Sequence, residues 1–214
     1  MSQPARRYVS EVRDEQARRT RRAIVTAARE LFLGQGYAAT TIDAIAAAAH
    51  VSRRTVFNAV GGKTVLLKLA LEWAIVGDDE PVPLADRPAI KAIQAERDPR
   101  RALALWVDMV VDIAARVAPI GAVLYAAADG DPEAAELLAS EAQVRMYGAR
   151  AFAGHLASLD GLAPGVSEQQ AADLCWAVND GHLYSLLVTQ RGWTPAAFAQ
   201  WLSDSLAATL VRPS

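Results

Sequence analysis

The stretch "DAIAAAAHVSRRTVFNAVGGK", residues 43–63, decides the fold of this chain. Its alanine-rich helical pattern stops at His50, begins again after Ser52 and stops a second time at a pair of glycines. The segment between the two breaks is about two helical turns long, which is too short to be stable alone. It carries two adjacent arginines, Arg53 and Arg54. We therefore expect a short helix that other helices hold in place, with its charged side chains turned outward.

Helical periodicity continues upstream of this stretch. Apolar residues recur every three or four positions over residues 16–33, and Thr40 or Thr41 is in place to cap the helix that ends near His50. Three helices with a tight turn between the second and the third form a helix-turn-helix, in which the first two hold the third from behind. The side chains that the third helix then presents outward are Arg53, Arg54, Thr55 and Asn58.

These outward side chains are of the types that read DNA. Arginine donates two hydrogen bonds to guanine, asparagine pairs with adenine, and threonine contacts a thymine methyl group or a phosphate. Backbone N–H groups and the helix dipole favour a phosphate at helix N-termini. The residues at those N-termini are Thr41, Ser52 and Lys63. The basic run "ARRTRR", residues 17–22, offers Arg18 and Arg22 for further phosphate or minor-groove contacts, with a plain solvated surface as the alternative.

Residues 21–73 resemble the N-terminal domain of the TetR family of transcriptional repressors. The resemblance rests on "AARELFLGQGYAATTIDAIA" (27–46), "VSRRTVF" (51–57) and Lys63 followed shortly by two leucines. It implies a repressor that binds double-stranded operator DNA as a homodimer. The rest of the chain fits the family only in layout. That layout is a larger helical domain ending in two long helices, which in this family binds a small molecule and dimerises.

The chain departs from the family pattern in the helix-turn-helix itself. His50 stands where the family has a turn glycine, and histidine adopts positive φ more readily than most residues. Phe57 replaces the usual tyrosine of the recognition helix, so a packing ring is kept and a phosphate-binding hydroxyl is lost. Residues 59–60 and 61–62 replace the usual His-Phe and Pro-Ser pairs. We expect DNA binding with an altered set of phosphate contacts, and Phe57 remains a candidate DNA-facing residue.

The two parts of the chain carry opposite charge. Residues 1–73 contain 12 Lys and Arg against 6 Asp and Glu, a net charge of +6, whereas residues 74–214 carry a net charge of −8. This asymmetry suggests that the N-terminal part meets a polyanion, with a merely solubilising basic end as the alternative.

Composition argues against a secreted or membrane protein. Cys175 is the only cysteine, so it has no intramolecular disulfide partner, and the arginine-rich N-terminus lacks the apolar core of a signal peptide. The longest apolar stretch, residues 103–128, is interrupted every four positions by Asp108, Asp112 and Arg116. We expect a cytoplasmic protein with no membrane segment.

The chain is predicted to be all-α, with about nine helices and no β-type alternation. A disordered arm over residues 1–15 precedes a helix-turn-helix domain over 16–62 and a connecting helix over 63–76. A ligand-binding and dimerisation domain follows over 77–214. Capping residues, prolines and glycines place the helices of that domain over residues 89–95, 99–117, 119–128, 132–159, 168–190 and 195–211.

The layout implied by the resemblance places effector-facing side chains on the inner faces of three long helices of the second domain. Such a pocket suits a small apolar or aromatic effector, although each candidate also fits a plain core. The candidates are Trp106, Met109, Val110, Ile113, Tyr125, Tyr147, Phe152, His155, Trp176, Asn179 and Leu183.

The last two predicted helices are apolar on more than one side. A helix of this kind is covered by more than its own domain, which predicts a twofold four-helix dimer interface, with a self-contained core as the alternative. The interface candidates are Leu174, Val178, Leu186, Leu187, Phe198, Trp201 and Leu202.

No catalytic residues, metal site or cofactor are predicted. Cys175 and His182 lie two helical turns apart, which is wider than usual zinc-ligand spacings, and the three histidines form no recognisable catalytic triad. The chain is therefore predicted not to be an enzyme. Two other hypotheses stay open at this point. One is an all-α ligand-binding protein or enzyme with a vestigial DNA-binding domain, and the other is an interaction module whose basic face meets an acidic protein.

Overall fold

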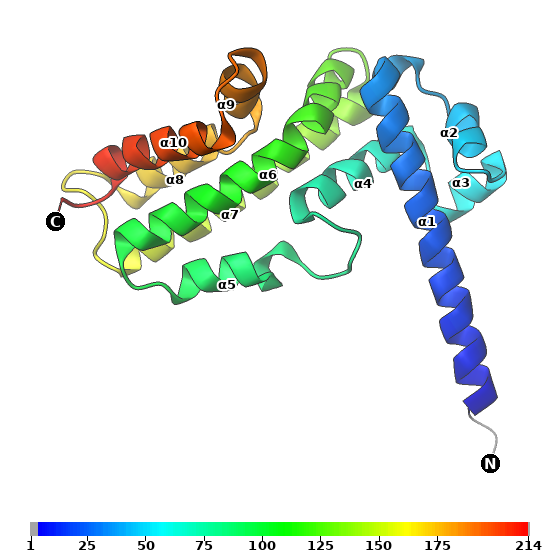
Figure 1. The fold of residues 1–214 in the computed structure, drawn as a ribbon, viewed down its shortest axis with the longest axis horizontal. Coiled ribbons are helices and arrows are strands. Elements are labelled where there is room, and N and C mark those ends of the chain that lie inside the picture. Colours follow the sequence, from blue (N-terminus) through cyan, green and yellow to red (C-terminus); the bar gives the residue numbers. More distant parts are fainter. Residues whose placement is uncertain (1–3, 214) are drawn as a thin grey trace.

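The computed structural model describes residues 4–213, which are mostly helical (Figure 1). The α-helices are α1 (Pro4–Ala39), α2 (Ile42–Ala48), α3 (Arg53–Ala59), α4 (Lys63–Val76), α5 (Pro88–Ala95), α6 (Pro99–Ala128), α7 (Pro132–Ser158), α8 (Glu168–Val178), α9 (His182–Tyr184) and α10 (Pro195–Leu210). A 3-10 turn η1 (Leu84–Asp86) precedes α5, and a π-helical segment η2 (Ser185–Gln190) follows α9. The predicted all-α class is confirmed, with ten α-helices in the described residues where about nine were expected.

Buried apolar side chains form two cores. The first core joins α1–α4 to the C-terminal half of α6 and the start of α7, and it includes Phe32, Leu66 and Leu124. The second core joins α5–α10 and includes Trp106 and Phe152. Helices α6 and α7 lie side by side and run from one core to the other (Figure 1). The domain boundary predicted after residue 76 does not coincide with a boundary in the packing. The end of α6 and the start of α7 follow residue 76 in sequence but pack in the first core.

Helix α1 begins earlier than the sequence predicted. Residues 1–15 were expected to be disordered, but α1 is helical from Pro4 onward, and residues 1–3 lie outside the described residues. The segment that follows Pro4 has no glycine or further proline until Gly34, which favours an uninterrupted helix. At the other end, Gly36 has φ 80° and ψ 169°, so the predicted glycine stop appears as a break inside this element.

Two of the later helices differ from prediction in opposite ways. A restart was predicted at Pro119, but α6 continues through it. Pro119 has no N–H to donate to the carbonyl of Ala115, and both residues are exposed, so water can satisfy that carbonyl. The predicted continuous helix over 168–190 is instead interrupted after α8. Gly181 takes φ 74° there and packs against Ala118 of α6, which bends the chain into α9 and η2.

The predicted helix starts are confirmed by their caps. The hydroxyl groups of four residues accept a backbone N–H bond from the first turn of the helix that follows. These residues are Thr41, Ser52, Ser167 and Thr194. Within the described part of the chain, no helix combines the length and the apolarity that crossing a membrane would require.

The turn between α2 and α3 is made by His50 at φ 54°. A non-glycine residue pays a steric cost in this region of φ/ψ space, because its Cβ atom approaches the backbone. The predicted left-handed turn is therefore present, and it is strained.

We expect His50→Gly to raise the free energy of unfolding by up to about 1 kcal/mol, because glycine adopts this φ without a Cβ clash. His50→Val is expected to lower it by about 1 kcal/mol or more, because β-branched residues tolerate positive φ least. Urea denaturation measures both effects. The control is Ala49→Gly, at φ −83°, which should lower stability. A less stable His50→Gly variant would contradict a strained turn and indicate a stabilising contact of the imidazole.

Candidate nucleic-acid interface

Helix α3 is held by its buried face. Val56 is fully buried in the first core together with Ile45 of α2. The Oγ of Ser52 accepts a hydrogen bond from the N–H of Thr55 at 3.0 Å, which closes the first turn of α3. In Figure 1, α2 and α3 lie on the opposite side of α1 from α6 and α7, so their outer faces are turned away from the second core.

The two adjacent arginines of α3 have different surroundings. The Nη1 of Arg53 donates to Oδ2 of Asp43 at 2.8 Å, and its guanidinium lies 5.6 Å from the ring centroid of Phe57. Arg54 is exposed and makes no hydrogen bond or ion pair with another described residue. Phe57 and Asn58 are also exposed on this helix. Arg53 therefore links α3 to α2, whereas the guanidinium of Arg54 is available to a partner.

The predicted phosphate-binding hydroxyls are used within the chain. The Oγ1 of Thr41 accepts from the N–H of Ala44 at 3.1 Å, and the hydroxyls of Ser52 and Thr55 lie 2.8 Å apart. These interactions orient the hydroxyl groups at the helix starts. Contacts of these three side chains with DNA stay a prediction.

The side chain of Lys63 binds to Tyr37 of the first core. Its ammonium lies 4.0 Å from the ring centroid of Tyr37 and donates to the carbonyl oxygen of Tyr37 at 3.1 Å. A cation on an aromatic face is held by the quadrupole of the ring. The start of α4 is thereby attached to the end of α1, and the predicted phosphate contact of Lys63 remains untested.

The hydroxyl of Tyr37 joins the helix-turn-helix unit to the turn between α6 and α7. It lies 2.8 Å from Oγ1 of Thr64 and donates to Oδ2 of Asp131 at 3.0 Å. Thr64 in turn donates to Oε2 of Glu133 at 2.9 Å. Burial raises the pKa of Tyr37, which keeps its hydroxyl protonated as a donor. These bonds fix the start of α4 against the start of α7.

The other end of α4 is attached to α6 by Arg116. Its Nε and Nη2 atoms donate to the carbonyl oxygens of Ala74 and Ile75 at 2.8 and 3.1 Å. The last carbonyls of a helix lack partners within the helix and attract a cation. Both ends of α4 are therefore bonded to the α6–α7 pair.

The predicted phosphate contacts Arg18 and Arg22 face a carboxylate in this structure. Arg22 forms two hydrogen bonds with Asp79, at 2.8 and 2.5 Å, and Arg18 approaches the same carboxylate at 3.5 Å. The hydrogen bond from Arg22 lowers the pKa of Asp79 below its ordinary value. The two arginines therefore attach α1 to the loop after α4. A phosphate group would have to compete with Asp79 for them.

The predicted effector-lining residues fall into three groups. Trp106, Val110 and Phe152 are buried in the second core, where the rings of Trp106 and Phe152 stack with centroids 4.9 Å apart. The half-buried group consists of Met109, Ile113, His155, Trp176, Asn179 and Leu183. The third group, Tyr125 and Tyr147, is exposed.

The predicted inward orientation of Tyr125 and Tyr147 is not found. Their side chains are 39% and 79% exposed. Tyr147 lies about 140° around α7 from the buried Phe152, because an α-helix turns about 100° per residue. The helical pattern alone did not indicate which side of α7 meets the second core.

The predicted interface residues are also divided. Phe198 and Leu202 are almost fully buried in the second core, so they serve their own protomer, contrary to the prediction. Val178 and Leu187 are half-buried against the same core. The members that remain exposed are Leu174, Leu186 and Trp201.

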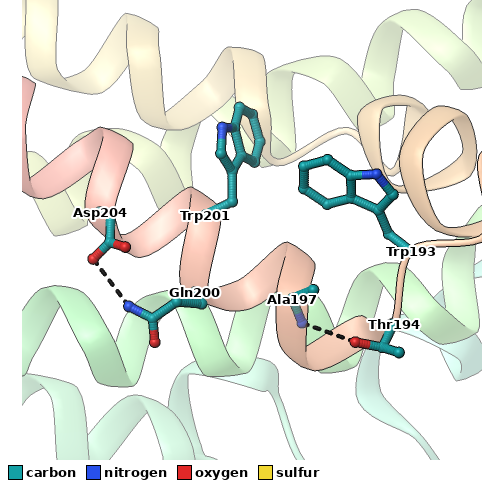
Figure 2. A pocket seen from close by; sticks show the side chains of 6 residues that line it. All are labelled: Trp193, Thr194, Ala197, Gln200, Trp201 and Asp204. Carbon is teal, nitrogen blue, oxygen red and sulfur yellow. Dashed lines mark hydrogen bonds between the residues drawn. The ribbon is translucent and has the colours of Figure 1, made fainter.

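Trp201 lines a shallow surface groove at the start of α10 (Figure 2). Its indole meets that of Trp193 edge to face, with ring centroids 6.1 Å apart. Gln200 and Asp204 border the groove and are joined by a hydrogen bond of 3.0 Å. Two indoles that are each 38% exposed form an apolar surface on the outer side of the last helix.

The residues considered for a metal site do not assemble into one. Cys175 is buried, and burial raises the pKa of its thiol to about 12, so the thiolate form is disfavoured. The Nε2 of His155 lies 3.2 Å from the carbonyl oxygen of Glu96, and the ring of His182 faces Tyr125. Within the described residues, no three His, Cys, Asp or Glu side chains are grouped to hold a metal ion.

Comparisons with known proteins place this geometry in context. Residues 24–70 match the family model of bacterial regulatory proteins, tetR family. A sequence comparison with curated proteins finds no match. Among solved structures, NalD of Pseudomonas aeruginosa, the secondary repressor of the MexAB-OprM multidrug efflux pump, aligns over 94% of this chain and 100% of its own, with 24% identity and a TM-score of 0.68.

Two further structures share the fold at lower identity. The fatty acid degradation regulator FadR from Bacillus halodurans has 15% identity over 87% of this chain and 94% of its own, with a TM-score of 0.68. A structure from Saccharomonospora viridis in complex with choline has 18% identity over 90% of this chain and 98% of its own, with a TM-score of 0.67. The fold therefore extends over both cores of the chain.

We expect Asp79→Asn to lower the free energy of unfolding by about 1 kcal/mol at pH 7, because it removes the charged partner of Arg22. The pKa of Asp79 is lower in the folded state than in the unfolded chain, so its stabilisation is present above the unfolded pKa and is lost as the pH falls through the folded one. The difference between variant and parent should therefore shrink below about pH 4.

Urea denaturation at several pH values measures this difference. The control is Asp86→Asn, because the carboxylate of Asp86 is exposed and lies 4.0 Å from Lys91. That substitution should leave stability unchanged. Equal stability of Asp79→Asn and the parent at pH 7 would contradict a stabilising link between α1 and the loop after α4.

Proposed function

Since its N-terminal domain places this chain in the tetR family of bacterial regulatory proteins, we propose that it is a repressor that binds operator DNA as a homodimer and is released by a small-molecule effector. Transcriptional regulation follows from the family. Repression, dimerisation and release by an effector are the proposed part.

The observation that carries the proposal is the outward face of α3. Burial of Val56 fixes the helix from behind, and Arg54 and Asn58 are left exposed on its other side. A short helix presented in this way enters the major groove, where arginine and asparagine read base edges. The positive charge of residues 1–73 supports the same partner, because a duplex attracts a basic surface over many phosphates.

Arg53 has a positioning role in this proposal. Its ion pair with Asp43 joins α3 to α2 at the surface before DNA arrives. Pre-set recognition elements bind more tightly, because less ordering is required on association. We therefore assign base or phosphate contact first to Arg54.

Dimerisation is proposed through the outer surface of α8, η2 and α10. Leu174, Leu186 and Trp201 are each more than a third exposed in the single chain, and Trp193 extends this surface. Association of two such surfaces about a twofold axis would remove the indoles from water. It would also present two copies of α3 to successive major grooves, which the spacing of operator half-sites requires.

Release by an effector is proposed to act through α4. This helix contributes to the first core, and its two ends are bonded to the α6–α7 pair through Thr64 and Arg116. An effector that favours another position of α6 or α7 would therefore move α4 and the helix-turn-helix unit with it. Such an effector can lower the affinity for the operator only as far as the effector itself binds one arrangement more tightly than the other.

We expect Arg54→Ala to weaken binding to the DNA upstream of the chain's own gene by about tenfold or more, because a charge-assisted contact to DNA is lost. Band-shift titration at several salt concentrations measures the affinity and its salt dependence. The matched control is Arg150→Ala, an exposed arginine on α7, which should bind like the parent. No shift by the parent protein at low salt, or equal binding by Arg54→Ala, would refute this role.

We expect Trp201→Arg to weaken the dimer by at least about tenfold, because a charge replaces an indole at the proposed interface. Sedimentation equilibrium over a range of protein concentrations measures the dissociation constant. Tyr147→Arg is the control, since Tyr147 is also an exposed aromatic residue but lies on α7. An unchanged dimer in Trp201→Arg would place the interface elsewhere on the molecule.

A further inference from the structure

Arg145 of α7 has a donor without a partner. Its Nε atom is buried and makes no hydrogen bond within the described residues. The guanidinium instead lies over the ring of Trp176 of α8, 5.2 Å from its centroid. A buried N–H of a charged group is strongly driven to find an acceptor, so an orphan of this kind in a folded protein indicates a missing partner.

The aromatic surface beneath Arg145 is held rigidly. The Nε1 of Trp176 donates to the carbonyl oxygen of Ala142 at 3.0 Å, which fixes the indole of α8 against the backbone of α7. Trp176 is half-buried and packs against the second core together with Met109. The guanidinium is therefore oriented by an indole whose own position is fixed.

No carboxylate of the described residues forms an ion pair with Arg145. Glu141 lies one turn earlier on α7, at the spacing that often forms an ion pair, but no such pair is present. Burial, followed by the charge of Glu72, raises the pKa of Glu141, whereas Lys68 and Arg145 oppose that shift. Lys68 and Glu72 of α4 form a pair with each other at 3.8 Å. Arg145 is thus within electrostatic reach of Glu141, but its Nε donor has no acceptor.

We propose that Arg145 and Trp176 form the recognition site for an effector that carries a carboxylate on an apolar body. A carboxylate accepts two parallel hydrogen bonds from a guanidinium, including one from Nε, and so supplies the missing acceptor. The apolar body lies along the side chains that border the indole. A cationic effector is disfavoured, because it would meet both Arg145 and Lys68.

This inference rests on the proposed release by an effector and identifies the chemical class of that effector. It also links binding to α4, because Glu141 interacts with Glu72 and Lys68 across the gap between α7 and α4. An anion at Arg145 adds repulsion toward Glu141 and changes the charge balance against α4. This helix carries Lys63 and Thr64 at its start, next to the helix-turn-helix unit.

The test compares acids with matched neutral amides. Benzoate, 1-naphthoate and decanoate are titrated beside benzamide, 1-naphthamide and decanamide by calorimetry, with decylamine as the cationic probe. At least one acid is expected to bind tenfold or more tightly than its amide, and decylamine is expected not to bind. Arg145→Gln should weaken the acid at least tenfold and leave the amide unchanged. Arg150→Gln, which changes an exposed arginine on the same helix, should behave like the parent.

Two measurements separate recognition from folding. Arg145→Gln is expected to unfold at the same temperature as the parent or higher, because it removes a buried donor without a partner. Glu141→Gln should strengthen acid binding, since it removes a neighbouring negative charge. The proposal is overturned if no acid is preferred over its amide, if Arg145→Gln keeps the preference, or if Glu141→Gln weakens the acid.

Operator binding of the same proteins is measured by band shift with and without the preferred acid. Release of DNA by that acid from the parent, and not from Arg145→Gln, supports the inference. An operator shift that no acid alters overturns the inference and leaves DNA binding standing. Absence of any operator shift overturns the proposed function itself, whatever the acids do.

Discussion

A helix of seven residues does not keep its shape in water, so α3 depends on the burial of Val56 in the first core. That core is built from α1, α2 and α4, and it is completed by residues of another part of the chain. Ile120 and Leu124 of α6 and Leu137 of α7 are buried in it. The position of the DNA-facing helix is therefore tied by packing to the long helices that also form the second core. A change in those helices cannot leave the first core untouched.

Polar contacts at both ends of α4 add to this packing. Tyr37 bonds to the starts of α4 and α7, and Arg116 bonds to the end of α4. A helix held at both ends moves as a rigid piece, since its internal hydrogen bonds resist bending. Glu141, one turn before Arg145 on α7, interacts electrostatically with Lys68 and Glu72 of the same α4. The proposed effector site and the proposed DNA site are thus connected through one helix.

Much of the fold could be predicted because its signals are local. Helix starts depend on a side chain that bonds to the backbone within three residues, as at Ser52 and Thr194, and these were found. The disorder expected before residue 16 and the unbroken helix over 168–190 were wrong. Weak polar patterning still allows a helix, and the bend at Gly181 depends on contact with α6, which no local pattern reveals. The candidate site residues show the same difference between local and long-range signals. Arg54 is exposed on α3 as predicted, whereas Phe198, predicted at a dimer interface, is buried in its own protomer.

By itself, the sequence determined the helices, their caps, the left-handed turn at His50 and the concentration of positive charge near the helix-turn-helix. Each of these rests on neighbours in the chain or on composition. Only the tertiary structure decided which partner each charge takes: Asp43 for Arg53, Asp79 for Arg22, and none for the Nε of Arg145. The physical reason is that ion pairs and burial depend on distances between residues far apart in sequence. Helical periodicity describes the faces of a helix but not what covers them.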